Sequence, residues 1–369
     1  MRLDLSACSS LTTFASNSNN LTSLQYLNLQ SCEKLSKFSV TLENIVELNL
    51  TGCRSINALP SSFGCHSKLE TRKLRATQIK SMPSSIKDLT RLRKLDIKYC
   101  KKLVALPELP SSVETLLVYD CYSLKTVLFP STVAEQLKEN KKEVEFWNCR
   151  NLDKSSLINI GLNVQINLMK FANAGSDQAV YVYPGSSVPD WLVYRTTKND
   201  MIVDLSQPHL SPFLGFVLCF VFAEGMGIAF YLKIKLKIAT IEGDDEKEGV
   251  DINLRMPMVI DSDHVCMIYN QPCSEYLTRI AKIQTSFKIK VTAWTVSMSR
   301  FNEEERKVEW IEFGISPKER EVELNEFGIS PINQSTYQNL IQQMEYECAE
   351  PEGERNKGNR KRKRKEGAT

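Results

Sequence analysis

The chain has 369 residues, of which 42% are hydrophobic and 25% charged, a composition typical of globular proteins and a length sufficient for two domains. The formal net charge is only +3, so no global electrostatic field argues for nucleic acid or a membrane surface as a partner. The eleven cysteines are an odd number without a C-x-x-C pair, and no signal peptide begins at Met1, which favours a reduced, intracellular compartment.

A short leucine pattern with a cysteine at a constant place recurs from the first residues to about Asp153. One unit consists of Leu24, Leu27, Leu29, Cys32, Leu35 and Phe38. The same order begins again at Ile45, Leu92 and Val113, and partial units begin at Leu3 and Val144. About seven units at intervals of roughly 21 to 28 residues match the leucine-rich-repeat signature. We expect each unit to supply one strand with inward leucines, followed by a buried cysteine whose thiol can donate to a backbone carbonyl.

The array has two irregular features. One unit (Leu69, Leu74, Thr77, Ile79, Met82) lacks a residue and carries Arg72 where an apolar residue belongs, which leaves its local geometry open. In addition, no polar capping unit precedes Leu3, although a solenoid needs one to cover the end of its core. This favours the C-terminal part of a longer array, or a truncated gene product.

The side chains that alternate with the inward leucines predict one concave sheet surface. Its middle is basic, and its C-terminal end is apolar and aromatic, a combination common among interface hot spots. We therefore predict that this surface binds a protein. The alternative is that the surface is simply solvated and that Trp147 packs on the next domain. The candidate contact residues are Lys73, Arg75, Lys94, Lys98, Tyr119 and Trp147.

After a linker or helix at residues 154–178, the pattern changes to many short strands at residues 179–345. The expected strands are Val180–Tyr183, Met201–Leu205, Phe213–Phe222, Ile228–Ile241, Val250–Arg255, His264–Tyr269, Phe287–Val296 and Val308–Phe313. Turn signals such as Pro184-Gly185 and Gln271-Pro272 separate them, which predicts a β-sandwich. A segment ending in F-G-I-S-P occurs twice, at 307–317 and 321–331, and only one copy is expected in the sheet.

The apolar stretch from Phe213 to Leu232 is long enough to cross a bilayer. However, Glu224 and two glycines interrupt its middle, and Lys233, Lys235 and Lys237 then alternate with apolar residues. We therefore favour a β-hairpin over a membrane helix.

The C-terminal region combines a predicted helix with a charged tail. Ser335 and Gln338 form a possible capping box for the helix. Residues 346–369 form an acidic and then basic tail that we expect to be disordered. Its basic run predicts a nuclear localisation signal or a segment that binds polyanions loosely. The alternative is that the run only keeps the chain soluble. The run comprises Lys357, Arg360, Lys361, Arg362, Lys363, Arg364 and Lys365.

Catalysis has little support in the sequence. The three histidines, His66, His209 and His264, lie far apart, and His264 falls within an expected strand. Neither G-x-x-x-x-G-K-[ST] nor G-x-G-x-x-G occurs. We therefore expect no catalytic residues, no metal and no cofactor.

Two groups of residues resemble the repeats and the post-repeat domain of a known family. The Cys-bearing repeats, with ALPSS from Ala58 and SMPSSI from Ser81, resemble those of plant intracellular TIR-type nucleotide-binding leucine-rich-repeat disease resistance proteins. The run YPGSSVPDW from Tyr183 to Trp191 resembles the start of their C-terminal jelly-roll/Ig-like domain (C-JID). The resemblance implies a mainly β fold, in which a leucine-rich-repeat solenoid at residues 1–153 precedes a jelly-roll/Ig-like β-sandwich.

By this resemblance, the chain is the ligand-sensing part of an innate immune receptor, located in the cytoplasm, the nucleus or both. In the family, the repeats and C-JID bind a pathogen effector, and assembled TIR domains then hydrolyse NAD. A TIR domain is absent from this chain, so we expect no enzyme activity. The alternative is an adaptor or regulatory fragment that binds a host protein or an intact receptor, and receptor self-association is possible. No specific nucleic acid and no membrane is expected as partner.

Overall fold

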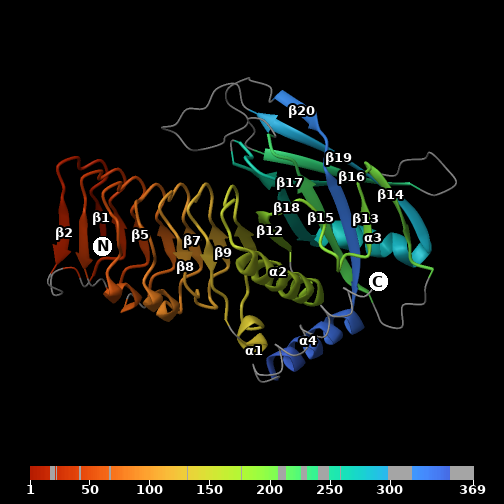
Figure 1. Cartoon of the computed structure of the whole chain (residues 1–369), viewed down its shortest axis with the longest axis horizontal. Coiled ribbons are helices and arrows are strands. Elements are labelled where there is room, and N and C mark those ends of the chain that lie inside the picture. The colour runs from red at the N-terminus through yellow and green to blue at the C-terminus, as the bar shows by residue number, and fades with distance from the viewer. Residues whose placement is uncertain are drawn as a thin grey trace, which may run out of the picture.

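The computed structural model describes residues 1–349 except for 17–20, 22, 41–42, 66–67, 131, 176, 207–212, 226–230, 240–248, 258 and 298–317. A solenoid of short parallel strands occupies one end of the molecule, and a two-layered β-sandwich occupies the other (Figure 1). The fold is mainly β, as predicted. The expected strand Val308–Phe313, the first F-G-I-S-P copy, His66, His209 and the basic run at 357–365 lie outside the described residues.

Each repeat contributes one three-residue strand to a parallel ladder. These strands are β1 (Arg2–Asp4), β3 (Tyr26–Asn28), β5 (Glu47–Asn49), β6 (Thr71–Lys73), β7 (Lys94–Asp96), β9 (Thr115–Leu117) and β11 (Glu143–Glu145). The return segments carry two further parallel pairs, β2 (Thr13–Ser16) with β4 (Lys37–Val40), and β8 (Ala105–Leu106) with β10 (Thr126–Val127). They also carry the short helices η1 (Ser61–Cys65), η2 (Ser84–Asp88) and α1 (Val133–Gln136). The inward leucines of successive repeats form one shared core.

The chain leaves each strand through a residue in the left-handed region, immediately before the Cys position. These residues are Ala7, Ser31, Gly52, Ala76, Tyr99, Asp120 and Asn148, with φ between 53° and 75°. The Cys side chain then points into the core. The thiols of Cys32, Cys53 and Cys100 donate to the carbonyls of Leu5, Leu29 and Leu74 in the preceding repeat, at 3.1, 3.0 and 2.9 Å. The predicted thiol-to-carbonyl bonds are therefore confirmed, and each one links two neighbouring repeats.

These buried thiols should be chemically inert in the folded chain. Burial raises the pKa of Cys53 to about 12, and a buried thiol cannot form the nucleophilic thiolate readily. In a chain with Cys8, Cys65 and Cys348 replaced by serine, we expect no reaction with a thiol reagent such as DTNB until denaturant is added. Rapid labelling of the remaining thiols in native buffer would show that the core opens.

The irregular unit keeps its place in the ladder. Arg72 pairs in register with Leu48 on one side and Leu95 on the other, so its side chain points into the core. It is completely buried. Thr77 takes the place of the cysteine, and its hydroxyl donates to the Leu74 carbonyl at 3.1 Å. The substitutions change the chemistry of this repeat and leave its backbone pairing intact.

No break in the sheet separates the repeats from the sandwich. Asp153 caps helix α2 (Lys154–Ala174) by accepting from the Ser156 amide, and Gly175 ends the helix with φ 62°. The helix then returns the chain to β12 (Gln178–Pro184), which pairs in parallel with β11. Beyond β12 the same 12-stranded sheet becomes antiparallel through β18 (His264–Asn270), β15 (Phe213–Phe222), β21 (Glu326–Asn333) and β13 (Tyr194–Thr196).

A second sheet covers the antiparallel part of the first. Its strand order is β14 (Asp200–Asp204), β19 (Ser286–Ser297), β16 (Tyr231–Ala239) and β17 (Val250–Arg255). A fifth strand, β20 (Lys318–Val322), also pairs with β19. The predicted hairpin of β15 and β16 is wrong, because these strands lie in different sheets. Gly225, with φ 83°, provides a turn after β15, and the chain then crosses to the other layer. Among the described residues, no helix is long and apolar enough to cross a membrane.

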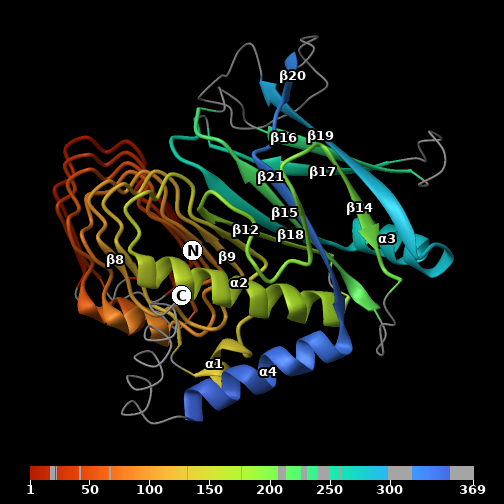
Figure 2. The same ribbon diagram turned by 45° about the vertical axis from the view of Figure 1, so that its right-hand side comes forward.

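Two helices of the sandwich correct the sequence predictions. Gln271-Pro272 begins helix α3 (Gln271–Ile283) instead of forming a simple turn, because Asn270 caps the helix and proline is tolerated in the first turn. Helix α4 (Gln334–Ala349) forms, but Asn333 accepts from the Thr336 amide at 2.8 Å, so Ser335 is not its cap. Helices α2 and α4 lie on the side of the molecule away from the second sheet (Figure 2). The second F-G-I-S-P copy lies in β21.

Candidate functional site

The concave surface of the first repeats is a hydrogen-bonded polar floor. Asn28 donates to both carboxylate oxygens of Asp4, at 3.1 and 3.0 Å. Asn49 in turn donates to the Asn28 side-chain oxygen at 3.0 Å and to Gln30 at 3.3 Å. These bonds run from repeat to repeat and fix the side chains before any partner arrives. Asn28 and Asn49 are only 9% and 6% exposed, so their conformations are already fixed and little side-chain entropy remains to be lost on binding.

The basic middle of the face is largely neutralised by its own carboxylates. Lys73 Nζ lies 3.1 Å from Glu47 Oε1, and Arg75 Nε donates to Asp96 Oδ2 at 2.8 Å, with a second bond from its Nη2. Lys98 Nζ lies 3.7 Å from the centroid of the Tyr119 ring. Lys94 is half-buried and takes part in no ion pair among the described residues. The face is therefore less electropositive than its basic residues alone suggest.

Tyr119 and Trp147 cannot contact a partner directly in this structure. Their exposed fractions are 4% and 0%. Both belong to the core between the two sheets of the sandwich, and the Trp147 ring lies 6.2 Å from Phe222 and 5.0 Å from His264. Their prediction as contact residues is wrong for this conformation, because the second domain covers this end of the concave face. The alternative for Trp147, packing on the next domain, is confirmed.

The buried carboxylate of Glu145 lies beside the side chains of Tyr119 and Trp147. Glu145 accepts from the Tyr119 hydroxyl and from Trp147 Nε1, the latter at 2.9 Å. Burial raises the pKa of Glu145 to about 7, with a further contribution from the charge of Glu143, against weaker opposing effects of Tyr119 and Lys98.

Asn148 and His264 connect the last repeat to the sandwich. The Asn148 amide donates to His264 Nε2 at 2.9 Å, and His264 Nδ1 lies 2.6 Å from the Ser262 carbonyl. This geometry requires neutral histidine with its proton on Nδ1. The Asn148 side chain also donates to the Val259 carbonyl and accepts from the Asp261 amide. Burial lowers the pKa of His264 to about 4.

Glu145 and His264 should give the junction opposite pH dependences. Glu145 keeps its proton up to about pH 7 when folded but only to about 4.5 when unfolded, so stability falls as pH rises through that window. Unfolded His264 binds a proton below about 6.5 but folded His264 only below about 4, so stability falls as pH drops through that window. Across its full pH window, each group changes the free energy of unfolding by about 3 kcal/mol.

We therefore expect Glu145→Gln to remove the fall in stability as pH rises from about 4.5 to 7. His264→Gln should remove the opposite fall as pH drops from about 6.5 to 4. Urea unfolding at pH 4 to 8 measures both. If each variant kept the wild-type pH profile, these two groups would not control the junction.

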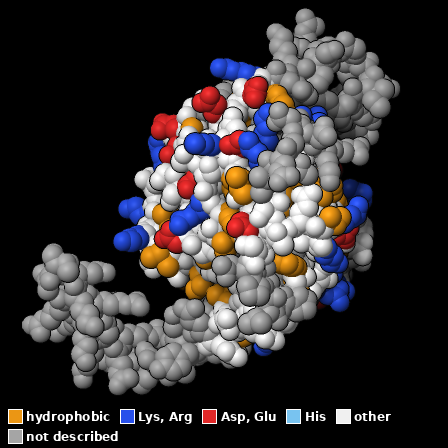
Figure 3. Space-filling model, turned by 90° about the vertical axis from the view of Figure 1, so that its right-hand side faces the viewer, with side chains coloured by type: hydrophobic (Ala, Val, Ile, Leu, Met, Phe, Trp, Pro, Cys, Tyr) orange, Lys and Arg blue, Asp and Glu red, His pale blue; other side chains and the backbone are white. Residues whose placement is uncertain are grey.

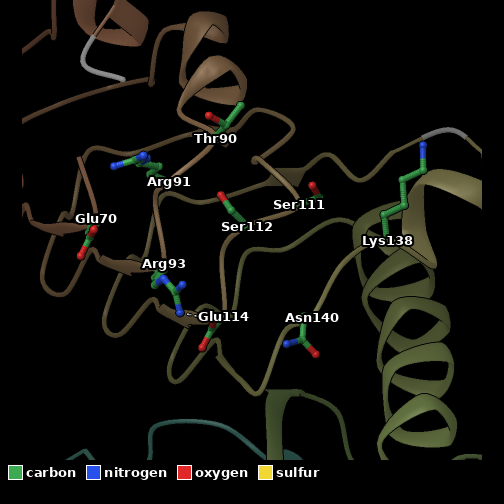
Figure 4. A pocket seen from close by; sticks show the side chains of 9 residues that line it. All are labelled: Glu70, Thr90, Arg91, Arg93, Ser111, Ser112, Glu114, Lys138 and Asn140. Carbon is green, nitrogen blue, oxygen red and sulfur yellow. Dashed lines mark hydrogen bonds and ion pairs between the residues drawn. The ribbon is translucent and has the colours of Figure 1, made fainter. Parts of the chain in front are cut away.

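A polar hollow of about 560 Å³ lies on the rim where β6, β7 and β9 begin (Figure 4). Arg93 donates to Glu114 across it at 3.0 Å, and Lys142 lies 3.5 Å from the same carboxylate. Charges of both signs and several hydroxyls line the hollow, whereas small-molecule sites are mostly apolar. It therefore suits a hydrated protein surface better than a small ligand. The lining residues are Glu70, Thr90, Arg91, Arg93, Ser111, Ser112, Glu114, Lys138 and Asn140.

Sequence reasoning missed Glu145, Asn148 and the junction role of His264. The repeat pattern places Glu145 on the outward face, and an outward carboxylate normally lies in water. Only the alternation VEFW from Val144, which puts a carboxylate and a Trp on one side of a strand, could have suggested that this face is covered.

The fold and junction define a leucine-rich-repeat protein whose repeat sheet continues into a β-sandwich domain. Residues 183–338 match the family model of the C-JID domain. Disease resistance protein RPS4 from Arabidopsis thaliana is 30% identical over 220 residues, which cover 56% of this chain and 17% of RPS4. TMV resistance protein N from Nicotiana glutinosa is 29% identical over 188 residues, 48% of this chain and 16% of that protein.

The chain is thus homologous to the C-terminal part of plant TIR-type nucleotide-binding leucine-rich-repeat disease resistance proteins, which confirms the resemblance found in the sequence. It spans less than a fifth of the length of these relatives. Among solved structures, the leucine-rich repeat domain of the type III effector XopL aligns with 41% of this chain and 70% of its own length, at 18% identity and a TM-score of 0.28.

Proposed function

We propose that the chain is the ligand-sensing part of a plant immune receptor and binds a pathogen effector protein. The contact surface would be the open part of the concave face, from β1 to β7, together with the sandwich. The observation that carries this proposal is that outward side chains from β1 to β7 keep exposed surface, among them Arg2, Glu47 and Lys94. In contrast, the sandwich covers the face at β9 and β11. Lys73, Arg75, Lys94 and Lys98 remain contact candidates.

Co-precipitation with a panel of secreted pathogen proteins tests the proposal. We expect at least one of them to bind the full chain, and Lys94→Glu to weaken that binding at least tenfold, since hot-spot changes cost about 2 kcal/mol or more. Lys102→Glu is the matched control, because it makes the same charge change at an exposed residue of a return segment. Equal binding by the wild type and Lys94→Glu would exclude this part of the face.

The chain is also proposed to act without catalysis of its own. NAD hydrolysis would belong to a TIR domain, and the sequence contains none. Purified chain incubated with NAD should release no nicotinamide beyond the buffer blank. Release that persists through repurification would contradict the proposal.

We further propose a cytoplasmic and nuclear distribution, with the basic run at 357–365 as the nuclear address. Deleting residues 357–365 from a fluorescent fusion should lower the nuclear share of the signal, because importers read clustered lysine and arginine. Replacing the acidic residues Glu350, Glu352 and Glu354 by glutamine is the control and should leave the distribution unchanged. If the deletion left the nuclear share of the signal unchanged, the run would not be a nuclear localisation signal and would serve only as a solubilising tail.

A further inference from the structure

The outward face of the second sheet concentrates positive charge in a chain that is nearly neutral. Strict alternation along β16 and β19 buries the aliphatic residues and places Lys233, Lys235, Lys237, Lys288 and Lys290 outward. This sheet forms the outer layer of the sandwich, away from α2 (Figure 2). Because residues two apart on a strand are about 6.8 Å apart and neighbouring strands about 4.8 Å, the five ammonium groups share one small area.

The register places two of these lysines against each other. Lys237 on β16 lies directly opposite Lys290 on β19. Like charges in directly opposed positions destabilise an antiparallel pair. Two ion pairs at the margins, Lys288–Asp200 at 2.6 Å and Lys233–Asp251 at 3.6 Å, offset part of this repulsion. Among the described outward residues of this sheet, six cations face four carboxylates, one of which is Glu321 on β20, directly opposite Trp294, so the surface favours a negatively charged partner.

Apolar side chains flank the lysines. Ile202 on β14 is 56% exposed and lies directly opposite Lys288. Trp294 on β19 is half-buried and lies directly opposite Lys233. From Lys288 to Trp294 the strand rises about 20 Å, which about six residues of extended chain would span. On the end of the sandwich that faces away from the repeats, hydrophobic side chains lie among charged ones (Figure 3).

We propose that this lysine face, the outward surface of β14, β19, β16 and β17, binds an extended acidic segment of a partner protein with an apolar residue at each end. The proposal rests on the proposed function as a protein-binding module and adds a second surface and the chemistry it recognises. A protein segment fits better than a nucleic acid, because no arginine lies at the centre of the face and the exposed aliphatic side chain of Ile202 suits an apolar residue better than a base.

Fluorescence anisotropy with a labelled peptide, four glutamates between two leucines, tests the proposal on the full chain. The expected result is saturable binding at low salt that weakens as salt increases. Peptides with four glutamines between leucines, or four glutamates between serines, should bind at least fivefold more weakly. Equal binding of all three peptides would overturn the proposal.

The triple variant Lys235→Gln, Lys237→Gln, Lys290→Gln should raise the peptide Kd at least tenfold, and Ile202→Ser about threefold. The matched control, Lys101→Gln, Lys102→Gln, Lys125→Gln, changes the net charge equally on exposed repeat residues and should stay within twofold of wild type. A cooperative thermal unfolding transition in the triple variant shows that it is folded. Equal losses in both triple variants would mean that net charge or the basic tail binds the peptide.

Tighter binding of a labelled 20-nucleotide single strand than of the peptide, lost in the same triple variant, would assign the face to nucleic acid and overturn the proposal. Failure here is separable from failure of the concave-face proposal. The lysine-face variants leave Lys94 intact, and Lys94→Glu leaves the lysine face intact.

Discussion

Trp147→Ala should lower the free energy of unfolding by about 3–5 kcal/mol, the range for removing a large aromatic side chain from a core. The indole is completely buried between the last repeat and the sandwich, against Phe222 and His264. Its loss leaves a cavity, and it leaves Glu145 without the 2.9 Å bond from the indole nitrogen. Because Glu145 is itself buried, the lost donor adds to the cost.

Urea unfolding followed by circular dichroism measures this effect. Trp147→Phe should cost less than Trp147→Ala, because the smaller ring preserves most of the packing but not the bond to Glu145. Val104→Ala, at a side chain that is 44% exposed, should change stability by less than about 0.5 kcal/mol. A loss below about 1 kcal/mol for Trp147→Ala would show that the sandwich does not depend on this contact.

Arg72→Leu should raise the free energy of unfolding by about 3 kcal/mol. The guanidinium is completely buried, and none of its nitrogens has a hydrogen-bond partner among the described residues. Burial alone lowers the pKa of Arg72 well below its ordinary range. Its main compensation is the Phe63 ring, whose centroid lies 3.1 Å from the guanidinium carbon. A cation–π contact of about 2 kcal/mol does not offset the desolvation of an unpaired charge.

Thermal and urea unfolding of Arg72→Leu and Arg72→Met measure the gain. Leucine is the residue that neighbouring repeats have at this position, Leu48 and Leu95, so it fits the same inward site. Arg91→Leu, at an exposed arginine of the next repeat, is the control and should have little effect. Destabilisation by both Arg72 variants would show that the cation is held by interactions stronger than the Phe63 contact.

The sequence predicted the repeats well because burial follows a strict period. Apolar residues at nearly every inward position and cysteine at all turns but that of Thr77 leave one plausible register, and the Cys32 and Cys53 thiols bond as expected. The left-handed residue before each cysteine could not be predicted. Ala7, Ser31 and Tyr99 share no residue type, and the amide of each donates to a carbonyl of the following repeat, a contact between units that residue type does not reveal.

The sandwich and the junction were harder to predict, because their pairing is decided between distant segments. Alternation located β15 and β16, but it could not show that they belong to different sheets. The same alternation placed Trp147 outward correctly. It could not reveal that the outward side is covered there by Phe222 and His264, which lie far along the chain.

Among the described residues, the sheet of the repeats runs unbroken through β11 and β12, so one hydrogen-bonded framework carries both candidate binding surfaces. The concave floor and the lysine face are held at one preset angle. A partner that touches both gains the second contact without the entropic cost of aligning two loosely tethered modules, so two weak contacts combine into tight binding. The same stiffness excludes partners whose own two epitopes do not match that angle, which makes geometry a source of selectivity.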